Sequence, residues 1–184
     1  MKNTYWRAVD TATQAHRGEY RKVVHVPYVV HPLRVAGILA AHGLPEEPLG
    51  IAALLHDVVE HGKMRSIDIE DQFGPEVARL VRGVTPPEGA GAWKERKRAS
   101  IERLKSAEAS VLILACADKL DNLISIREDL SRFGQATWGR LGRSPQEQAW
   151  YYRSLADLFE TNLCGEPGAL IAFELSAEVH RVFG

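Results

Sequence analysis

The sequence has little cysteine and no excess of charge of either sign. Cys116 and Cys164 are the two cysteines among 184 residues, and two distant cysteines do not make a disulfide framework. Cys116 stands in the apolar run VLILACA, which predicts a buried thiol. The 23 basic and 24 acidic residues leave a formal net charge of −1. This balance argues against a dedicated nucleic-acid-binding or membrane-surface protein.

Long apolar runs are also missing. The uncharged apolar stretches are far shorter than the ~20 residues that a membrane-spanning helix needs. The N-terminal residues MKNTYWRAVD contain no apolar signal region, so we expect a cytoplasmic protein. A chain of this length that is 45% hydrophobic can bury the core of one ordinary domain.

Apolar residues recur at helical spacing through most of the chain, which predicts an all-α fold in one domain. The segment VVHVPYVV (23–30) is rich in β-branched residues but is interrupted by Pro27, so we expect a loop or a short ribbon. The segment TPPEGAGAW (85–93) is the clearest predicted loop. Helices are expected over residues 4–17, 32–42, 47–61, a short stretch from Pro75, 94–106, 108–131, 145–163 and 167–182.

The stretch IAALLHDVVEHG (51–62) places a His-Asp pair inside an apolar run. Residues three or four apart share a helix face, so a continuous helix would point His56, Asp57 and Glu60 to one place. An unpaired carboxylate in a core is costly. A divalent cation removes that cost, because it binds neutral imidazole and carboxylate oxygen together.

Two other positions supply further ligands for such a cation. His31 stands immediately before Pro32, and Asp118 lies in CADKLDN after an apolar helical run. Asn122 and Ser125 follow Asp118 at helical spacing and face the same way. A His-His-Asp-Asp set with open positions suits a catalytic metal, and mixed nitrogen and carboxylate donors indicate Mn²⁺, Fe²⁺ or Zn²⁺. The alternative for Asp118 is an ion pair with Lys119 or a neighbouring arginine.

The order of these motifs resembles that of the HD-domain phosphohydrolases, and within them the hydrolase domain of the RelA/SpoT family. At this length the chain is similar to the small stand-alone alarmone hydrolases of the Mesh1 type. The resemblance covers roughly residues 5–130, and the segment EQAWYYRSLADLF is similar to the family's closing helix. The matching stretches are AHRGEYRK, PYVVHPLRVAGIL, AALLHDVVE, FGPEVARLVRGVT, ERKR and ADKLDNL.

The resemblance implies a single HD domain over residues 1–184, a helical bundle with a metal site in the core cleft. Its core would span about 5–130, followed by C-terminal helices at about 145–182. The resemblance implies Mn²⁺ as the usual ion. It also implies the roles of individual residues: His31, His56, Asp57 and Asp118 as metal ligands, Glu60 in positioning or activating the attacking water, Arg21 and Lys22 against a guanine base, and Asn122 and Ser125 facing the nucleotide.

The sequence departs from the family pattern at His61, where the family carries the second acid of its HDxxED motif. Because the pKa of a free histidine lies near neutrality, His61 is a candidate catalytic acid or base beside Glu60. The alternatives are a contact with a phosphate or a plain surface residue.

The apolar loop VVHVPYVV also differs from the family's polar turn, which affects the expected base specificity. The basic run KERKR, from Lys94 to Arg98, is either a contact for substrate phosphates or a solvated helix face.

Three functions remain open at this point. The first is a metal-dependent phosphohydrolase that converts guanosine 3′,5′-bis(diphosphate), or its pentaphosphate form, to GDP or GTP plus pyrophosphate. The second is a phosphatase acting on NADPH or another phosphorylated nucleotide. The third is a non-catalytic HD domain that binds a nucleotide. In each case the expected partner is a small nucleotide, not a nucleic acid or a membrane.

Overall fold

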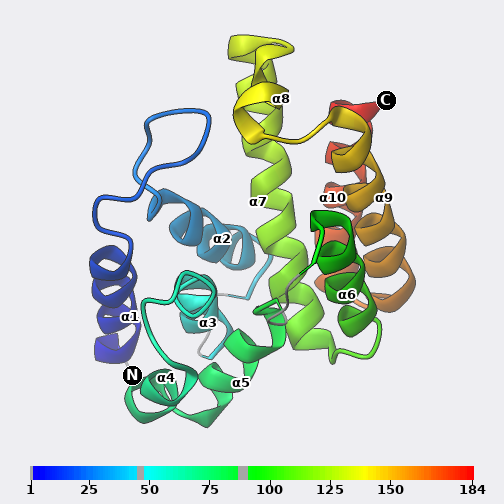
Figure 1. The fold of residues 1–184 in the computed structure, drawn as a ribbon. Coiled ribbons are helices and arrows are strands. Elements are labelled where there is room, and N and C mark those ends of the chain that lie inside the picture. The colour runs from blue at the N-terminus through cyan, green and yellow to red at the C-terminus, as the bar shows by residue number, and fades with distance from the viewer. Residues whose placement is uncertain (1, 45–47, 87–90) are drawn as a thin grey trace. The chain divides into compact units, whose positions relative to one another are not determined.

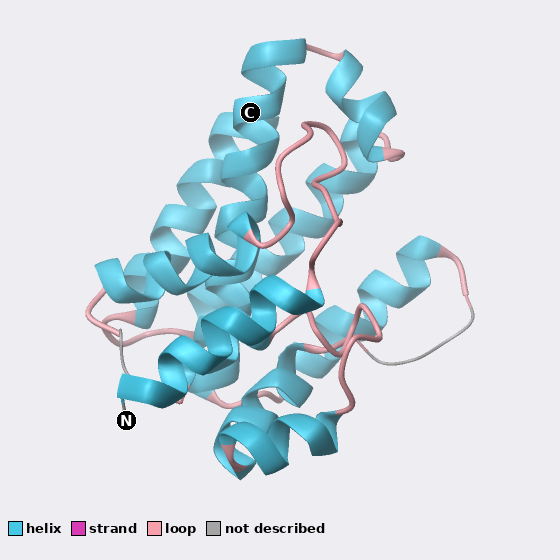
Figure 2. Cartoon of the chain, turned by 90° about the vertical axis from the view of Figure 1, so that its left-hand side faces the viewer, coloured by secondary structure: helices cyan, strands magenta, loops and turns pink. Residues whose placement is uncertain are grey.

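The computed structural model describes residues 2–44, 48–86 and 91–184. Over these residues the chain is helical, and none is coloured as a strand in Figure 2. Figure 1 shows the helices in chain order. They are α1 (Lys2–Ala15), α2 (Val30–Ala41), α3 (Leu49–Leu55), α4 (Ser66–Phe73), α5 (Pro75–Val84), α6 (Trp93–Leu104), α7 (Ala109–Phe133), α8 (Ala136–Leu141), α9 (Pro145–Asn162) and α10 (Gly168–Phe183).

The all-α prediction is confirmed, and most predicted helices agree with the observed ones within a few residues. The largest difference is α3, which ends at Leu55 instead of continuing to residue 61. The short helices α4 and α8 were not predicted. Residues 23–29 form a loop, in which Pro27 makes an isolated antiparallel bridge to Tyr20, and Val30 begins α2. The middle of the predicted loop 85–93 lies outside the described residues.

The helices fall into two compact units, α1 to α5 and α6 to α10, with the short segment Lys22–His25 grouped with the second. In the first unit α3 contacts α1, α2 and α5, and α4 contacts α5. Its sequence LGIAALL is buried from Gly50 to Leu55. Small and aliphatic side chains on all sides let three helices pack around it. The C-terminal end of this central helix carries the His-Asp pair.

In the second unit the 25-residue helix α7 contacts α8, α9 and α10. Its apolar face includes Leu114, Leu120 and Leu123, each at most 1% exposed. Glu178 on α10 is also buried, and its carboxylate pairs with Arg127 on α7 at 2.8 Å and with Arg181. Cys116 is confirmed as a buried thiol with a pKa raised by burial.

The basic run on α6 packs against aromatic rings. Lys94 and Arg98 lie over the Trp150 ring, 5.2 and 5.9 Å from its centroid. Lys97 lies 4.7 Å from the centroid of Tyr151. Since both rings belong to α9, these cation–π contacts hold α6 against α9. The contacts favour a structural role for this basic run.

Among the described residues, no helix has both the length and the apolar character of a membrane span.

Candidate metal centre

Two histidines and an aspartate converge within the first unit. His31 lies in the first turn of α2, and His56 and Asp57 directly follow α3. The Nε2 atoms of the two histidines are 3.2 Å apart. Asp57 Oδ2 lies 3.2 Å from His56 Nε2 and 3.5 Å from His31 Nε2. All three side chains are buried, so three potential metal donors meet in a largely dry site.

The chain reaches this geometry by leaving the helix after Leu55. The amide of Val58 donates to the Leu55 carbonyl, and the amide of Gly62 donates to the Val59 carbonyl, both three residues back. Gly62 then adopts a positive φ of 67°, which favours glycine. The prediction of one continuous helix through residue 61 is therefore wrong.

This local geometry also bears on Glu60, whose role stays a prediction. A regular helix would have placed its side chain beside His56 and Asp57, but the turns leave Glu60 exposed while the other two are buried. The apolar residues that flank the motif are compatible with a continuous helix and with the observed turns, so the sequence pattern does not distinguish the two. A role for Glu60 consequently has to involve a solvent-accessible carboxylate.

Hydrogen bonds fix the orientation of the candidate ligands. His56 Nδ1 donates to the Ala53 carbonyl at 2.7 Å, which places the Nδ1 proton there and directs Nε2 toward His31 and Asp57. The Tyr28 hydroxyl donates to Asp57 Oδ2 at 2.7 Å. Hydrogen bonds from groups that do not themselves bind the metal commonly set the tautomer and the direction of metal-binding side chains. The sequence analysis did not identify Tyr28.

The electrostatics keep Asp57 ionised. Burial by itself raises the pKa of this carboxyl group. The charge of His56, a hydrogen bond from it, the charge of His31 and the Tyr28 hydroxyl all lower it, and the pKa of Asp57 lies well below its usual value. The site thus presents a carboxylate beside two imidazoles.

The spacing of these donors fits a divalent transition ion. With metal–donor bonds near 2.1 Å, neighbouring ligands of a tetrahedral or octahedral ion lie about 3.0 to 3.4 Å apart. The three measured separations run from 3.2 to 3.5 Å. Imidazole nitrogen combined with carboxylate oxygen suits Mn²⁺, Fe²⁺ or Zn²⁺.

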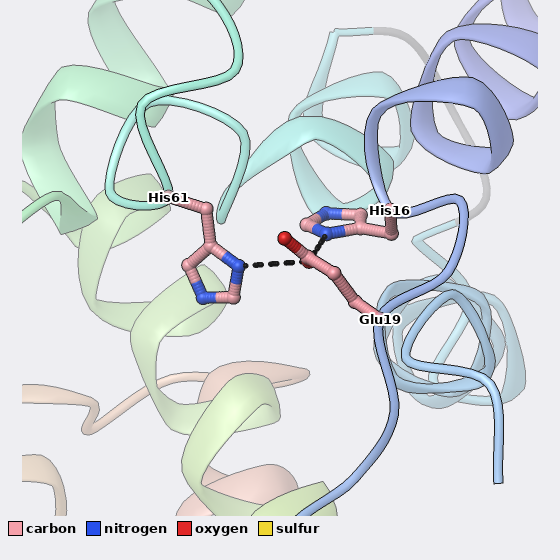
Figure 3. Close-up of side chains that lie close together, drawn as sticks. All are labelled: His16, Glu19 and His61. Carbon is pink, nitrogen blue, oxygen red and sulfur yellow. Dashed lines mark hydrogen bonds and ion pairs between the residues drawn. The ribbon is translucent and has the colours of Figure 1, made fainter.

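A second group of side chains, His16, Glu19 and His61, lies on the other side of Tyr28 in the same unit. Figure 3 shows both histidines directed at the Glu19 carboxylate. Glu19 Oε2 is 2.8 Å from His16 Nδ1 and 3.2 Å from His61 Nδ1. The other oxygen of Glu19 is 2.6 Å from Lys63 Nζ. The sequence analysis identified His61 but not its partners, His16 and Glu19.

Burial of His16 and pairing of Glu19 both lower the pKa values in this group, with opposite effects on charge. Desolvation lowers the pKa of His16, although Glu19 acts to raise it. The hydrogen bond from Lys63, then that from His16, lowers the pKa of Glu19 to about 2. The group therefore combines an ionised carboxylate with a histidine that burial favours in its neutral form.

The loop after α1 positions the predicted base-binding pair. The Arg21 amide donates to the Val26 carbonyl, and the Tyr28 amide donates to the Glu19 carbonyl, both at 2.9 Å. The Arg21 guanidinium lies 5.8 Å from the centroid of the Tyr28 ring. Lys22 is exposed. Arg21 is thus held next to the metal centre by way of Tyr28.

Three further predicted residues lie on α7 in the second unit. Asp118 is buried, and it accepts hydrogen bonds from Lys119 Nζ at 2.5 Å and Asn122 Nδ2 at 2.6 Å. Burial lowers the pKa of Lys119, but Asp118 together with Tyr151 and Tyr152 more than offsets this, so the pKa lies well above its usual value. Ser125 lies farther along the helix and is half-buried. The grouping of Asp118, Asn122 and Ser125 with the histidines remains a prediction.

Comparisons with known proteins agree with this architecture. The chain is 38% identical over 121 residues to the guanosine-3′,5′-bis(diphosphate) 3′-pyrophosphohydrolase MESH1 of Drosophila melanogaster, covering 65% of this chain and 67% of that protein. It is 38% identical over 120 residues to an Aquifex aeolicus enzyme of the same activity, covering 64% of this chain but 17% of that longer protein.

A solved structure is similar to this chain over nearly the whole length of both. It is described as a metazoan ortholog of SpoT that hydrolyzes ppGpp and plays a role in starvation responses. The match has a TM-score of 0.79 at 28% identity and covers 98% of this chain and 97% of the other. Residues 8–143 match the HD domain family. With the His-Asp pair at the end of α3 and a second histidine beside it, the chain belongs to the HD-domain family.

Proposed function

We propose that this protein is a metal-dependent phosphohydrolase that converts guanosine 3′,5′-bis(diphosphate), or its pentaphosphate form, to GDP or GTP plus pyrophosphate. The convergence of His31, His56 and Asp57 in a chain similar to MESH1 carries the proposal. In the reaction a water oxygen attacks the phosphorus bonded to the 3′ oxygen. The bond between phosphorus and that oxygen breaks, and the 3′ oxygen gains a proton as pyrophosphate departs.

His31, His56, Asp57 and Asp118 are the proposed ligands of the ion, and Mn²⁺ is its proposed identity. Such an ion lowers the pKa of water and stabilises phosphoryl charge. The hydrogen bonds from His56 to Ala53 and from Tyr28 to Asp57 support this assignment, because they direct a nitrogen and an oxygen toward one point. On α7, Lys119 and Asn122 donate hydrogen bonds to the Asp118 carboxylate and fix its orientation on that helix.

Glu60 and His61 are the proposed proton-transfer groups. Glu60 is exposed, and its carboxylate is accessible to a substrate water. His61 Nδ1 is bonded to Glu19, so its Nε2 atom is the position at which the ring exchanges a proton. Glu19 thereby positions the His61 ring.

The nucleotide is proposed to contact Arg21, Lys22, Asn122 and Ser125. A planar guanidinium stacks well on a purine base, and Arg21 is already held over the Tyr28 ring. Asn122 and Ser125 supply polar groups for the sugar. We also propose the cytoplasm as the compartment, since both cysteines are free thiols, as expected in a reducing environment.

The direct test is product analysis with Mn²⁺-loaded protein, using guanosine tetraphosphate and NADPH in separate reactions. We expect stoichiometric pyrophosphate and GDP from the first. Release of orthophosphate from NADPH alone would replace the proposal with an NADPH phosphatase. If protein that retains Mn²⁺ gives no product from either nucleotide, hydrolysis of the alarmone is excluded and a binding function is favoured.

A further inference from the structure

The side chains of His16, Glu19 and His61 have the composition of a metal site. None of the three is a ligand proposed for the first site. One ligand atom from each residue lies within 4.8 Å of the other two. The two ring nitrogens converge on a single carboxylate oxygen, Glu19 Oε2, at 2.8 and 3.2 Å (Figure 3). Around a tetrahedral Zn²⁺ ion, neighbouring nitrogen and oxygen ligands lie about 3.3 Å apart. Small shifts would therefore admit an ion.

His16 is fully buried, and its Nδ1 atom is the ring nitrogen that faces Glu19. Its side chain is 0% exposed. Its Nδ1 atom is bonded to Glu19, but its Nε2 atom has no hydrogen-bond partner among the described residues. Burying a polar ring with one nitrogen unsatisfied is unfavourable. A neutral buried imidazole facing a carboxylate is also the form in which histidine binds metals.

The surroundings favour one carboxylate oxygen as the ligand. Lys63 Nζ holds Glu19 Oε1 at 2.6 Å, which leaves Oε2 directed at the two histidines. The His16 and His61 rings meet edge to face at 5.2 Å between centroids. Three protein ligands without a thiolate are typical of zinc sites that keep one position for water.

We propose that His16, Glu19 and His61 form a second binding site for a divalent transition ion of the Zn²⁺ type. The Tyr28 ring lies 4.8 Å, between centroids, from both the His16 and the His61 rings, and its hydroxyl bonds to Asp57. Tyr28 therefore contacts both groups, and the two sites share no ligand. Ion binding at His61 Nδ1 would leave the ring proton on Nε2.

The test is the zinc stoichiometry of the full-length protein, measured by calorimetric titration and by elemental analysis after gel filtration. We expect two equivalents for the wild type. His61→Gln and Glu19→Gln should each lose one, and His56→Ala should lose the other. His56→Ala combined with His61→Gln should bind none, whereas His180→Asn, an exposed histidine on α10, should keep both.

Cobalt provides a second measurement that does not depend on activity. The Co²⁺-loaded His56→Ala variant should keep a visible absorption spectrum that the added Glu19→Gln change abolishes. A wild type that binds one equivalent, lost in His56→Ala but kept in His61→Gln, would overturn the proposal. If the wild type binds one equivalent that is lost in His61→Gln and kept in His56→Ala, the result would instead support the second site and refute the assignment of the first. Circular dichroism confirms that each variant is folded.

Discussion

The Nε2 atoms of His31 and His56 face each other at 3.2 Å, although 25 positions separate the residues in the sequence. The His56 ring already donates its Nδ1 proton to the Ala53 carbonyl, so a neutral His56 directs a lone pair toward His31. Two histidines arranged in this way share either one proton or one cation. The neighbouring Asp57 carboxylate stabilises positive charge between the two rings in either case.

His56→Ala should weaken Mn²⁺ binding at the first site by at least ~100-fold, because it removes a direct ligand, and outer-sphere changes alone cost 10- to 100-fold. Asp118→Ala should have an effect of similar size. Isothermal titration with Mn²⁺ measures both. His42→Ala is the matched control, since His42 also bonds through Nδ1 to a backbone carbonyl, that of Ile38. Wild-type affinity in His56→Ala would refute the assignment.

Tyr28→Phe should lower Mn²⁺ affinity by about 10- to 100-fold while leaving the fold intact. The change deletes the hydroxyl that donates to Asp57 Oδ2 and keeps the ring that packs against three histidines. Tyr20→Phe, at an exposed tyrosine in the same loop, serves as the control. Equal affinities for the two variants would mean that the Tyr28 hydroxyl does not orient the ligand.

His61→Asp restores the family's acid but places it near the Glu19 carboxylate. His61 Nδ1 lies 3.2 Å from Glu19 Oε2, so two carboxylates would meet where an imidazole and a carboxylate now pair. We expect His61→Asp alone to lower the melting temperature. Adding Glu19→Gln should recover it and give the higher alarmone hydrolysis rate of the two variants. Thermal unfolding and product assays measure the two effects, and additive changes in the double variant would contradict this coupling.

Arg21→Ala should raise the KM for a guanosine nucleotide more than it changes Mn²⁺ affinity. The guanidinium lies over the Tyr28 ring and is not a proposed metal ligand. Loss of a stacked cation costs about 0.5–2 kcal/mol, which corresponds to roughly 2- to 30-fold in affinity. Arg17→Ala, at an exposed arginine just upstream, should leave KM unchanged. An unaltered KM in Arg21→Ala would mean that Arg21 is a surface residue that does not contact the nucleotide.

Arg127→Ala should lower the free energy of unfolding by about 1–3 kcal/mol, because it leaves the buried Glu178 carboxylate with a hydrogen-bond site unfilled. Arg181 retains its own contact with Glu178, which keeps the loss at the lower end of that range. Urea denaturation measures the difference. Arg132→Ala, at an exposed position on the same helix, should change stability by less than about 0.5 kcal/mol.

Helical periodicity was sufficient to predict the all-α class and the long helices. Helices α4 and α8 were missed because eight and six residues present too few turns for a clear apolar stripe. The end of α3 was missed for a different reason. The apolar residues Val58 and Val59 continue the pattern past Leu55, and only the backbone hydrogen bonds show that the chain has left the helix.

The same limit applies to the site. The His-Asp pair and His31 were identified because charged and imidazole side chains are unusual in apolar runs. Tyr28, His16 and Glu19 were overlooked because a tyrosine or a histidine near a loop is unremarkable in sequence. Their importance comes from the backbone bond between the Tyr28 amide and the Glu19 carbonyl, which brings the loop ends together.

The packing of α6 against α9 gives the protein an internal spectroscopic reporter. Two of the four tryptophans, Trp93 and Trp150, lie 6.3 Å apart between ring centroids. Lys94 and Arg98 lie over the Trp150 ring, and Arg143 lies over the Trp93 ring. Indole emission responds to nearby charge and to solvent. Release of α6 from α9 would therefore change the intrinsic fluorescence, while Trp6, which is 66% exposed, contributes a nearly constant background. The opening of this helix pair can be followed without attaching a dye.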